Sequence, residues 1–180
     1  GVFTPASDDP IAERTVLDNL RLAEPAIRRY TAEILAAEGP TRLDRLTSII
    51  ARRFGMRRIG AQKRDEIEAI VRANATITGD KDAFAWPKDI DPATWPGLRR
   101  NANASDRALD EISPQEIVNA MTWLLASALS MSRDDLERET LTFFGYVRLT
   151  ETARSWLAEA IDLAVASGRI AESDGRFRNT

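Results

Sequence analysis

The chain contains no cysteine and no histidine among its 180 residues. The absence of cysteine excludes disulfides and thiol nucleophiles, and it fits a reducing compartment. Without histidine there is neither a Ser-His triad nor a histidine general base. Zinc sites built from these two residue types are excluded as well. We therefore expect no catalytic centre of these kinds, no metal and no cofactor.

Long apolar runs and a net positive charge are also lacking. No stretch approaches the roughly 20 apolar residues of a membrane helix, and no signal peptide opens the chain, so we expect a cytoplasmic protein without a membrane partner. The formal net charge is -3 and the pI is near 5.2, unlike a domain whose whole surface binds nucleic acid. Any such binding must be local. Because Gly1 replaces an initiating methionine, we expect a piece of a larger protein.

The most regular feature of the chain is helical periodicity. Apolar residues recur at helical spacing from Ile11 to Ala37, and Pro25 is expected to divide this run into two helices. Another helix is predicted from about Arg42 to Arg53, stopped at Phe54-Gly55, and a further one from about Ala61 to Ala73.

A β-hairpin is predicted after these helices. Residues 75–78 and 83–86 are β-prone, and they flank the turn sequence Gly79-Asp80-Lys81-Asp82. Residues 11–86 are thus predicted to form several helices followed by a hairpin. This is the order of elements in a winged helix, where the hairpin is the wing.

The flanking segments have a different composition. Residues 1–10 are predicted to be a loose tail, and the proline-rich residues 87–112 a linker. After the linker, Ser113 followed by Pro114 is a strong helix start, because serine caps the first turn and proline fits the first helical position.

A degenerate repeat relates the two halves of the chain. A shift of ninety places aligns Phe54-Gly55 with Phe144-Gly145, and it brings several apolar positions into register, such as Leu46 with Leu136 and Ile67 with Leu157. A shared core explains most of these matches. We therefore predict a mainly α fold with short β-hairpins, a tandem winged-helix (helix-turn-helix) duplication with copy one in residues 11–86 and copy two in residues 113–180.

The two copies differ in charge. Residues 40–86 carry ten basic and six acidic side chains, whereas residues 131–178 carry seven basic and nine acidic ones. Clustered lysine and arginine side chains bind nucleic-acid backbones because they release condensed counterions. Only copy one has such a cluster, and its members are the candidate nucleic-acid contacts: Arg52, Arg53, Arg57, Arg58, Lys63 and Arg64.

Two interpretations of this cluster stay open. In many winged helices the third helix enters the major groove and neighbouring basic groups contact phosphates. Arg57 and Arg58 would then contact phosphates just before this helix, while Lys63 and Arg64 in its first turn would reach further in. The alternative is a solvated basic loop whose arginines pair with the acids of the following helix (Asp65, Glu66 and Glu68).

Patterns typical of enzymes are missing. None of the three lysines lies in a phosphate-binding loop, and none follows an acid at the spacing of a restriction-type nuclease centre. The pairs Asp80/Asp82 and Asp89/Asp91 could hold a metal, but both have turn or linker composition. We expect a protein that is not itself an enzyme.

Arg99-Arg100 in the linker is a second, weaker candidate for nucleic-acid contact.

Several of these motifs occur together in a known family. Glu38-Gly39-Pro40, a Leu-rich helix, Arg53-Phe54-Gly55, Arg58-Ile59-Gly60, a charged helix and Phe84-Ala85-Trp86-Pro87 follow one another over about 50 residues. This stretch resembles an uncharacterised domain near the C-terminus of large bacterial superfamily 1 DNA/RNA helicase-like proteins, many of which also carry a restriction-endonuclease-like nuclease domain. Copy two resembles it less, since it has Thr150 in place of Gly60 and lacks the Trp-Pro ending.

The resemblance implies an accessory module of an ATP-dependent helicase or nuclease, and it supplies no catalytic residues. We therefore expect a non-catalytic module whose partners are DNA, bound through copy one, and the remaining domains of a larger protein. The alternative is a module for protein-protein interaction or intramolecular docking without nucleic-acid binding. Acidic copy two, with Trp123 and Trp156, would suit that role. No pattern indicates an oligomeric state.

Overall fold

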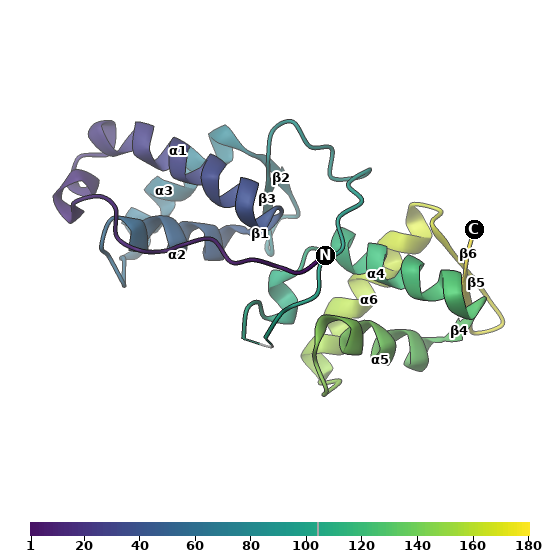
Figure 1. Ribbon diagram of the computed structural model, residues 1–180. Coiled ribbons are helices and arrows are strands. Elements are labelled where there is room, and N and C mark those ends of the chain that lie inside the picture. Colours follow the sequence, from purple (N-terminus) through teal and green to yellow (C-terminus); the bar gives the residue numbers. More distant parts are fainter. Residues whose placement is uncertain (104) are drawn as a thin grey trace. The chain divides into compact units, whose positions relative to one another are not determined.

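The structure is a computed structural model and describes residues 1–103 and 105–180. These residues form two compact units, an N-terminal unit (Pro5–Pro92) and a C-terminal unit (Gly1–Thr4 with Ala93–Thr180). Each unit is mainly helical and has one three-stranded antiparallel sheet (Figure 1). The predicted fold class is confirmed at this level. None of the helices described here has both the length and the apolar character needed to cross a bilayer.

The N-terminal unit begins with helices and ends with a hairpin. Its elements are η1 (Arg14–Asp18), α1 (Leu20–Glu38), β1 (Thr41–Arg42), α2 (Leu43–Arg53), α3 (Ala61–Asn74), β2 (Thr76–Thr78) and β3 (Phe84–Trp86). The strands are ordered β1-β3-β2, so β3 lies in the middle of the sheet. Its Ala85 is paired with Thr41 of β1 on one side and with Ile77 of β2 on the other. The predicted hairpin is confirmed.

The core of this unit lies between α1, α2 and α3. Each helix buries one apolar face, and the fully buried residues include Ile27, Ile34, Leu46, Ile50, Ile67 and Val71. Phe54 ends α2 by packing its ring against Tyr30, with 5.4 Å between ring centroids. Gly55 follows with φ +73°, which favours glycine, and its N–H donates to the Arg52 carbonyl. The chain therefore leaves α2 in a sharp turn toward α3.

Pro25 does not divide the first helical run, and this prediction is wrong. Pro25 is the sixth residue of α1, where it removes the hydrogen bond to the carbonyl of Arg21. Both Pro25 and Arg21 are exposed, so water can solvate that carbonyl. The buried face of α1, with Ala23 and Ile27 on either side of the proline, holds the helix together.

The C-terminal unit contains η2 and three longer helices before its own hairpin. Its elements are η2 (Leu109–Glu111), α4 (Pro114–Ala128), β4 (Met131–Ser132), α5 (Arg133–Phe144), α6 (Glu151–Ala166), β5 (Ile170–Ser173) and β6 (Arg176–Asn179). Ser113 caps α4 as predicted, since its Oγ accepts the Glu116 N–H at 3.3 Å. Ser132 and Thr150 cap α5 and α6 in the same way.

The two units share one order of elements, namely helix, short strand, two helices and a hairpin, and one order of strands. Residues aligned by the ninety-place shift hold the same positions. Phe54 and Phe144 both end the second helix and are fully buried, and Gly55 and Gly145 both have positive φ. The first strand of each sheet was not predicted, because two residues are too few to show alternation.

The boundaries of the two compact units differ from the boundaries predicted for the tail and the linker. Residues 1–4 lie against the segment that precedes α4. Val2 forms a parallel bridge with Arg100, and the N–H of Phe3 donates to the Arg100 carbonyl at 2.8 Å. The Phe3 side chain is buried. Trp95 is also held down, since the Asn119 side chain donates to its carbonyl at 3.0 Å.

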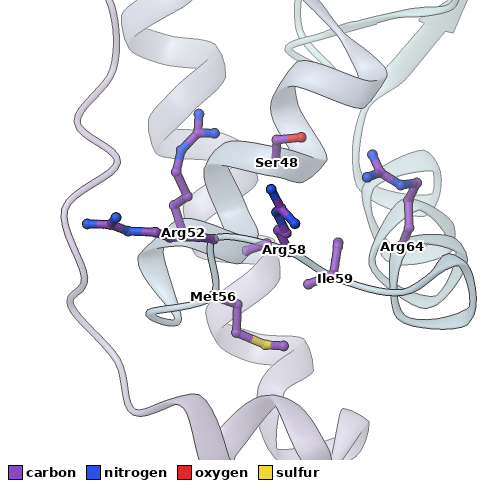
Figure 2. A pocket seen from close by; sticks show the side chains of 8 residues that line it. Ser48, Arg52, Met56, Arg58, Ile59 and Arg64 are labelled. Carbon is purple, nitrogen blue, oxygen red and sulfur yellow. The ribbon is translucent and has the colours of Figure 1, made fainter.

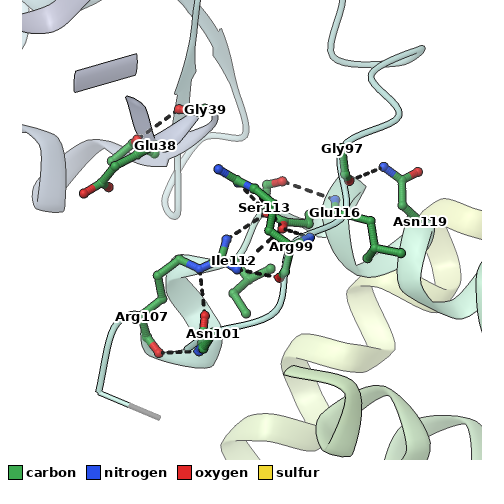
Figure 3. A network of polar contacts seen from close by, with 12 residues as sticks. Glu38, Gly39, Gly97, Arg99, Asn101, Arg107, Ile112, Ser113, Glu116 and Asn119 are labelled. Atoms are coloured by element: carbon green, nitrogen blue, oxygen red, sulfur yellow. Dashed lines mark hydrogen bonds and ion pairs between the residues drawn. The ribbon is translucent and has the colours of Figure 1, made fainter. Parts of the chain in front are cut away.

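A buried ionic network fixes this segment to α4 (Figure 3). The carboxylate of Glu116 is fully buried and accepts hydrogen bonds from Arg107 Nη1 at 2.8 Å and Arg99 Nη2 at 2.7 Å. Arg107 also donates to the carbonyl of Arg99, and its guanidinium lies 4.1 Å from the ring centre of Phe3. Burial lowers the pKa of Arg107. Because Arg99 and Arg107 both bind the Glu116 carboxylate, the segment before α4 is held against this helix in spite of its linker-like composition.

Replacing Glu116 by Gln should destabilise the C-terminal unit by about 3 kcal/mol, because Arg107 would stay buried without its counter-charge. Hydrogen-exchange mass spectrometry of peptides from α4 in increasing urea measures the change. Glu159→Gln is the control, since Glu159 is exposed and its side chain has no partner among the described residues. Equal protection of both variants would contradict a structural role for the network.

Candidate functional site

The six predicted contact residues lie on three consecutive segments of the N-terminal unit. Arg52 and Arg53 belong to the last turn of α2, Arg57 and Arg58 to the connection at residues 54–60, and Lys63 and Arg64 to the first turn of α3. The short connection brings these segments together. Their side chains nevertheless have different surroundings, and the set divides into paired and unpaired cations.

Arg53 is a buried structural residue. Its Nη1 donates to Glu33 Oε2 at 2.6 Å, and its Nε donates to the Ser7 carbonyl at 2.9 Å. The guanidinium also lies 5.2 Å from the ring centre of Tyr30. Only 8% of the side chain is exposed, so in this conformation Arg53 fixes residues near Ser7 to the helices and has little surface to offer a ligand.

Lys63 is also occupied. Its ammonium group donates to the Leu17 carbonyl at 2.9 Å and lies 2.8 Å from Glu66 Oε2. The close approach of the Lys63 ammonium group lowers the pKa of the Glu66 carboxyl. The solvated-loop interpretation expects arginines to pair with the acids of α3, whereas here Glu66 pairs with a lysine. Lys63 therefore joins the start of α3 to the end of η1.

Arg52 has a weaker attachment. Its Nε lies 2.5 Å from the Asp8 carboxylate, but this nitrogen has no aligned hydrogen bond. Both side chains are at least 40% exposed. Exposed ion pairs usually contribute less than about 1 kcal/mol, so an anion in solution could compete with Asp8 for this guanidinium.

Arg57, Arg58 and Arg64 are unpaired. Within residues 1–103 and 105–180 their side chains make neither a hydrogen bond nor an ion pair, and no acidic residue occurs in the connection from Phe54 to Gly60. Arg57 and Arg58 are exposed, and Arg64 is half-buried. The acids of α3 do not neutralise these three arginines, which is the opposite of what the solvated-loop interpretation expects.

The unpaired arginines surround one cavity of about 240 Å³. We call it the arginine cavity. Figure 2 shows the Arg58 side chain below Ser48, with Arg52 and Arg64 on opposite sides of it. Three residues of the lining are apolar and none is acidic, and the full lining is Ser48, Ala51, Arg52, Met56, Arg57, Arg58, Ile59 and Arg64. The lining supplies concentrated positive charge without a carboxylate that could act as a base.

A second hollow of about 250 Å³ lies next to the arginine cavity and shares Arg52 and Arg57 with it. Its other lining residues include Asp8 and Asp9. The acidic side chains therefore approach the arginines from the side of residues 8–10.

The corresponding region of the C-terminal unit has lost most of this charge. The ninety-place shift puts Thr142 in place of Arg52 and Val147 in place of Arg57. Arg154, which replaces Arg64, lies 3.2 Å from Asp134 and 3.0 Å from Glu137. Only Arg148, the counterpart of Arg58, is exposed and without a partner in the described chain. This region of the C-terminal unit can therefore serve as an internal comparison for the arginine cavity of the N-terminal unit.

The weaker candidates have other roles or surroundings. Arg99 belongs to the network around Glu116, and the Arg100 guanidinium lies 4.7 Å from the ring centre of Phe143. Asp82 lies 3.2 Å from Arg42. In the residues that the structure describes, no group of three or more acidic side chains could hold a metal ion.

Sequence reasoning located the arginines but missed several neighbours. Ser48 lies four residues before Arg52 on the same helix face, so helical spacing could have placed it beside the cluster. Met56 and Ile59 are adjacent to the arginines in the sequence and form part of the apolar lining. No sequence pattern pointed to Asp8.

Arg53→Ala should lower the free energy of unfolding of the N-terminal unit by about 2 kcal/mol, because it removes two charge-assisted hydrogen bonds from a buried side chain. Arg57→Ala should change it by less than about 0.5 kcal/mol, since that side chain is exposed and unpaired. Hydrogen exchange of α1 and α2 in increasing urea measures both values. A larger effect for Arg57 than for Arg53 would contradict this division.

Comparison with known proteins adds no assignment, since no family model, no curated protein and no solved structure matches the chain. The chemical character of the site therefore rests on the placement and pairing of its own side chains. It is a small cavity on the N-terminal unit, lined by Arg52, which pairs with Asp8, and by three arginines without a partner in the described chain, and it is suited to an anionic ligand.

Proposed function

We propose that this chain is a non-catalytic accessory module that binds nucleic acid through the arginine cavity. The observation that carries the proposal is that Arg57, Arg58 and Arg64 have no hydrogen-bond or ion-pair partner in the described part of the chain and line one cavity without an acidic residue. Free guanidinium groups are the usual contacts of phosphate oxygens. Arg52 joins them when an anion displaces Asp8, whereas Arg53 and Lys63 support the site.

We further propose that both units are winged helices. The order of elements and the strand orders β1-β3-β2 and β4-β6-β5 support this assignment, with the β2-β3 and β5-β6 hairpins as the wings. In such domains the third helix commonly enters the major groove. Here α3 pairs Lys63 with Glu66 and Arg72 with Glu68. We therefore infer contact with the phosphate backbone by the segment before α3, rather than base recognition by α3.

The proposed setting is a larger helicase- or nuclease-type protein whose remaining domains perform the catalysis. This part of the proposal rests on the resemblance of residues 38–87 to a domain of superfamily 1 helicase-like proteins. An accessory module with a local basic site would help such an enzyme to hold its substrate. The overall charge of -3 is compatible with this, because a single small site needs no basic domain.

A second candidate is a protein-interaction or docking module. The C-terminal unit exposes half of Trp123, and this ring lies 5.5 Å from that of Phe143. Val147 and Leu129 are exposed in the same unit. Trp156 is not available for this role, because it is buried and donates to the Ile112 carbonyl. Trp123 is the observation that favours this candidate.

Replacing Arg57 and Arg58 together by Ala should weaken binding to duplex or single-stranded DNA on the order of tenfold at about 50 mM salt, and it should lower the slope of log affinity against log salt by about 1.5. Fluorescence anisotropy with labelled oligonucleotides measures both quantities. Arg148→Ala is the control, since Arg148 aligns with Arg58 and is also exposed, and the two losses are compared per charge removed because the control removes one charge and the double variant two.

Two results would contradict the proposed function. One is the absence of DNA binding at low salt by the unmodified chain. The other is a loss per charge removed that is as large in the Arg148→Ala control as in the double variant, because this would mean that net charge rather than the arginine cavity determines affinity. Binding of a protein partner that is lost with Trp123→Ala would then favour the second candidate.

Asp8→Asn should strengthen DNA binding about threefold, because the Arg52 guanidinium loses the carboxylate that competes with phosphate. Asp9→Asn removes the same charge from a neighbouring residue that has no cationic partner in the described chain, so it should have a smaller effect. The same anisotropy titration compares the two. Equal effects of both substitutions would show that only the overall charge matters.

A further inference from the structure

The arginine cavity is too small for a cofactor and large enough for one charged group. Its volume is about 240 Å³. Sites for whole small molecules usually measure about 300–1,000 Å³. The cavity therefore suits a group that projects from a larger ligand, and its charge identifies what kind of group this is.

The number of cations exceeds what one internal phosphodiester requires. An internal phosphodiester carries a single negative charge on two free oxygens, whereas a terminal phosphate monoester carries about -1.5 to -2 on three oxygens near neutral pH. The lining holds three unpaired arginines and a fourth, Arg52, whose pair with Asp8 is exposed. Each guanidinium presents several N–H donors in one plane and can bind two oxygens at once.

The arrangement of the lining favours a chain end over a passing strand. Arginines reach the cavity from three segments, the end of α2, the connection and the start of α3 (Figure 2). Ala51, Met56 and Ile59 contribute apolar atoms to the same lining, and Ala51 is buried while the other two are half-buried. Apolar surroundings strengthen the attraction between charges by lowering the local dielectric. Ser48 adds no free donor, because its hydroxyl donates to the Asp44 carbonyl.

We infer that the arginine cavity binds a terminal phosphate monoester, the phosphorylated end of a nucleic-acid strand. This inference rests on the proposed function and adds to it the chemical class of the bound group. The 5′-phosphate and the 3′-phosphate share this chemistry, and the experiment separates them. The C-terminal unit cannot form the same site, since Val147 and Thr142 replace two of the four arginines and Arg154 is paired.

The test compares single-stranded oligonucleotides of one sequence that end in a 5′-phosphate, a 3′-phosphate or hydroxyl groups only. With the full chain, one of the phosphorylated strands should bind about tenfold more tightly than the hydroxyl strand. A hydroxyl-ended strand that is one nucleotide longer controls for added charge. It carries an additional internal phosphate, so an equal gain with that strand would overturn the inference.

Two variants locate the preference. Arg64→Ala and Arg58→Ala should each reduce the affinity ratio of phosphorylated to hydroxyl strands toward one, whereas Arg148→Ala should leave the ratio unchanged. The side chains of Arg58 and Arg64 have no partners in the described chain, so both variants should keep the fold, and circular dichroism checks this. A ratio that survives both substitutions would place the preference elsewhere and overturn the inference.

The pH gives an independent readout. The second ionisation of a phosphate monoester has a pKa near 6, so the preference should decrease as the pH falls from about 7.5 to about 5.5. The arginines stay charged over this range.

The same experiments distinguish a failure of the inference from a failure of the proposed function. Binding that depends on Arg57 and Arg58 but ignores the strand end refutes the inference alone, whereas no binding of any strand refutes both.

Discussion

A buried glutamate paired with arginine is the interaction on which both units depend. In the N-terminal unit, Glu38 at the end of α1 accepts two hydrogen bonds from Arg45, at 2.9 and 3.0 Å, and one from the backbone N–H of Ala6. In the C-terminal unit, Glu116 accepts hydrogen bonds from two arginine side chains and from the N–H of Arg99 at 3.0 Å. In each case the carboxylate binds an extended segment to a helix. A buried charge without such partners would be strongly unfavourable, so the segments and the glutamates must become ordered together.

These pairings also decide which cations remain at the surface of the N-terminal unit. Most of its arginines have an acidic partner within reach, as Arg45 has in Glu38 and Arg53 has in Glu33. The connection between α2 and α3 contains no acid, and Glu66 and Glu68 of α3 are directed to Lys63 and Arg72. Arg57, Arg58 and Arg64 are therefore among the arginines left without a partner in the described chain, and unlike Arg14 and Arg21 they line the cavity. A count of net charge over the segment would not distinguish the two classes.

Much of the fold follows from local patterns in the sequence. Helical spacing of apolar residues, the Ser113-Pro114 start and the Phe54-Gly55 stop predict the bounds of α2, α3 and α4 to within one or two residues, because these patterns act through neighbouring backbone groups. The run predicted from Ile11 is placed less well, since residues 11–13 are not helical and α1 begins only at Leu20, after η1. Pro25 was misjudged because the packing of α1 outweighs a single lost hydrogen bond on its exposed side. The segments at residues 1–10 and 87–112 have the composition of a tail and a linker, and although an aromatic residue such as Trp95 favours attachment to a surface, the sequence does not show which groups hold Trp95 or Phe3 in place.

The candidate site was predictable only in part, for the same physical reason. The sequence shows that arginines cluster around residues 52–64, but their availability depends on partners that lie far away in the chain. Arg53 binds Glu33 across 20 residues, and Lys63 binds Leu17 across 46 residues. Side-chain pairs at these separations leave no periodic pattern. The shape of the cavity likewise depends on how α2 and α3 pack, which composition does not specify.

The position of Phe3 affects how the chain can fold during synthesis. Residues 1–4 belong to the C-terminal unit, although the whole N-terminal unit separates them from the rest of it. A ribosome therefore releases Phe3 long before Arg99 and Arg107, the two guanidinium groups that lie on its ring, have been made. The N-terminal unit can complete its core first. The C-terminal unit can bury Phe3 in its final position only after residues 93–107 have also been made.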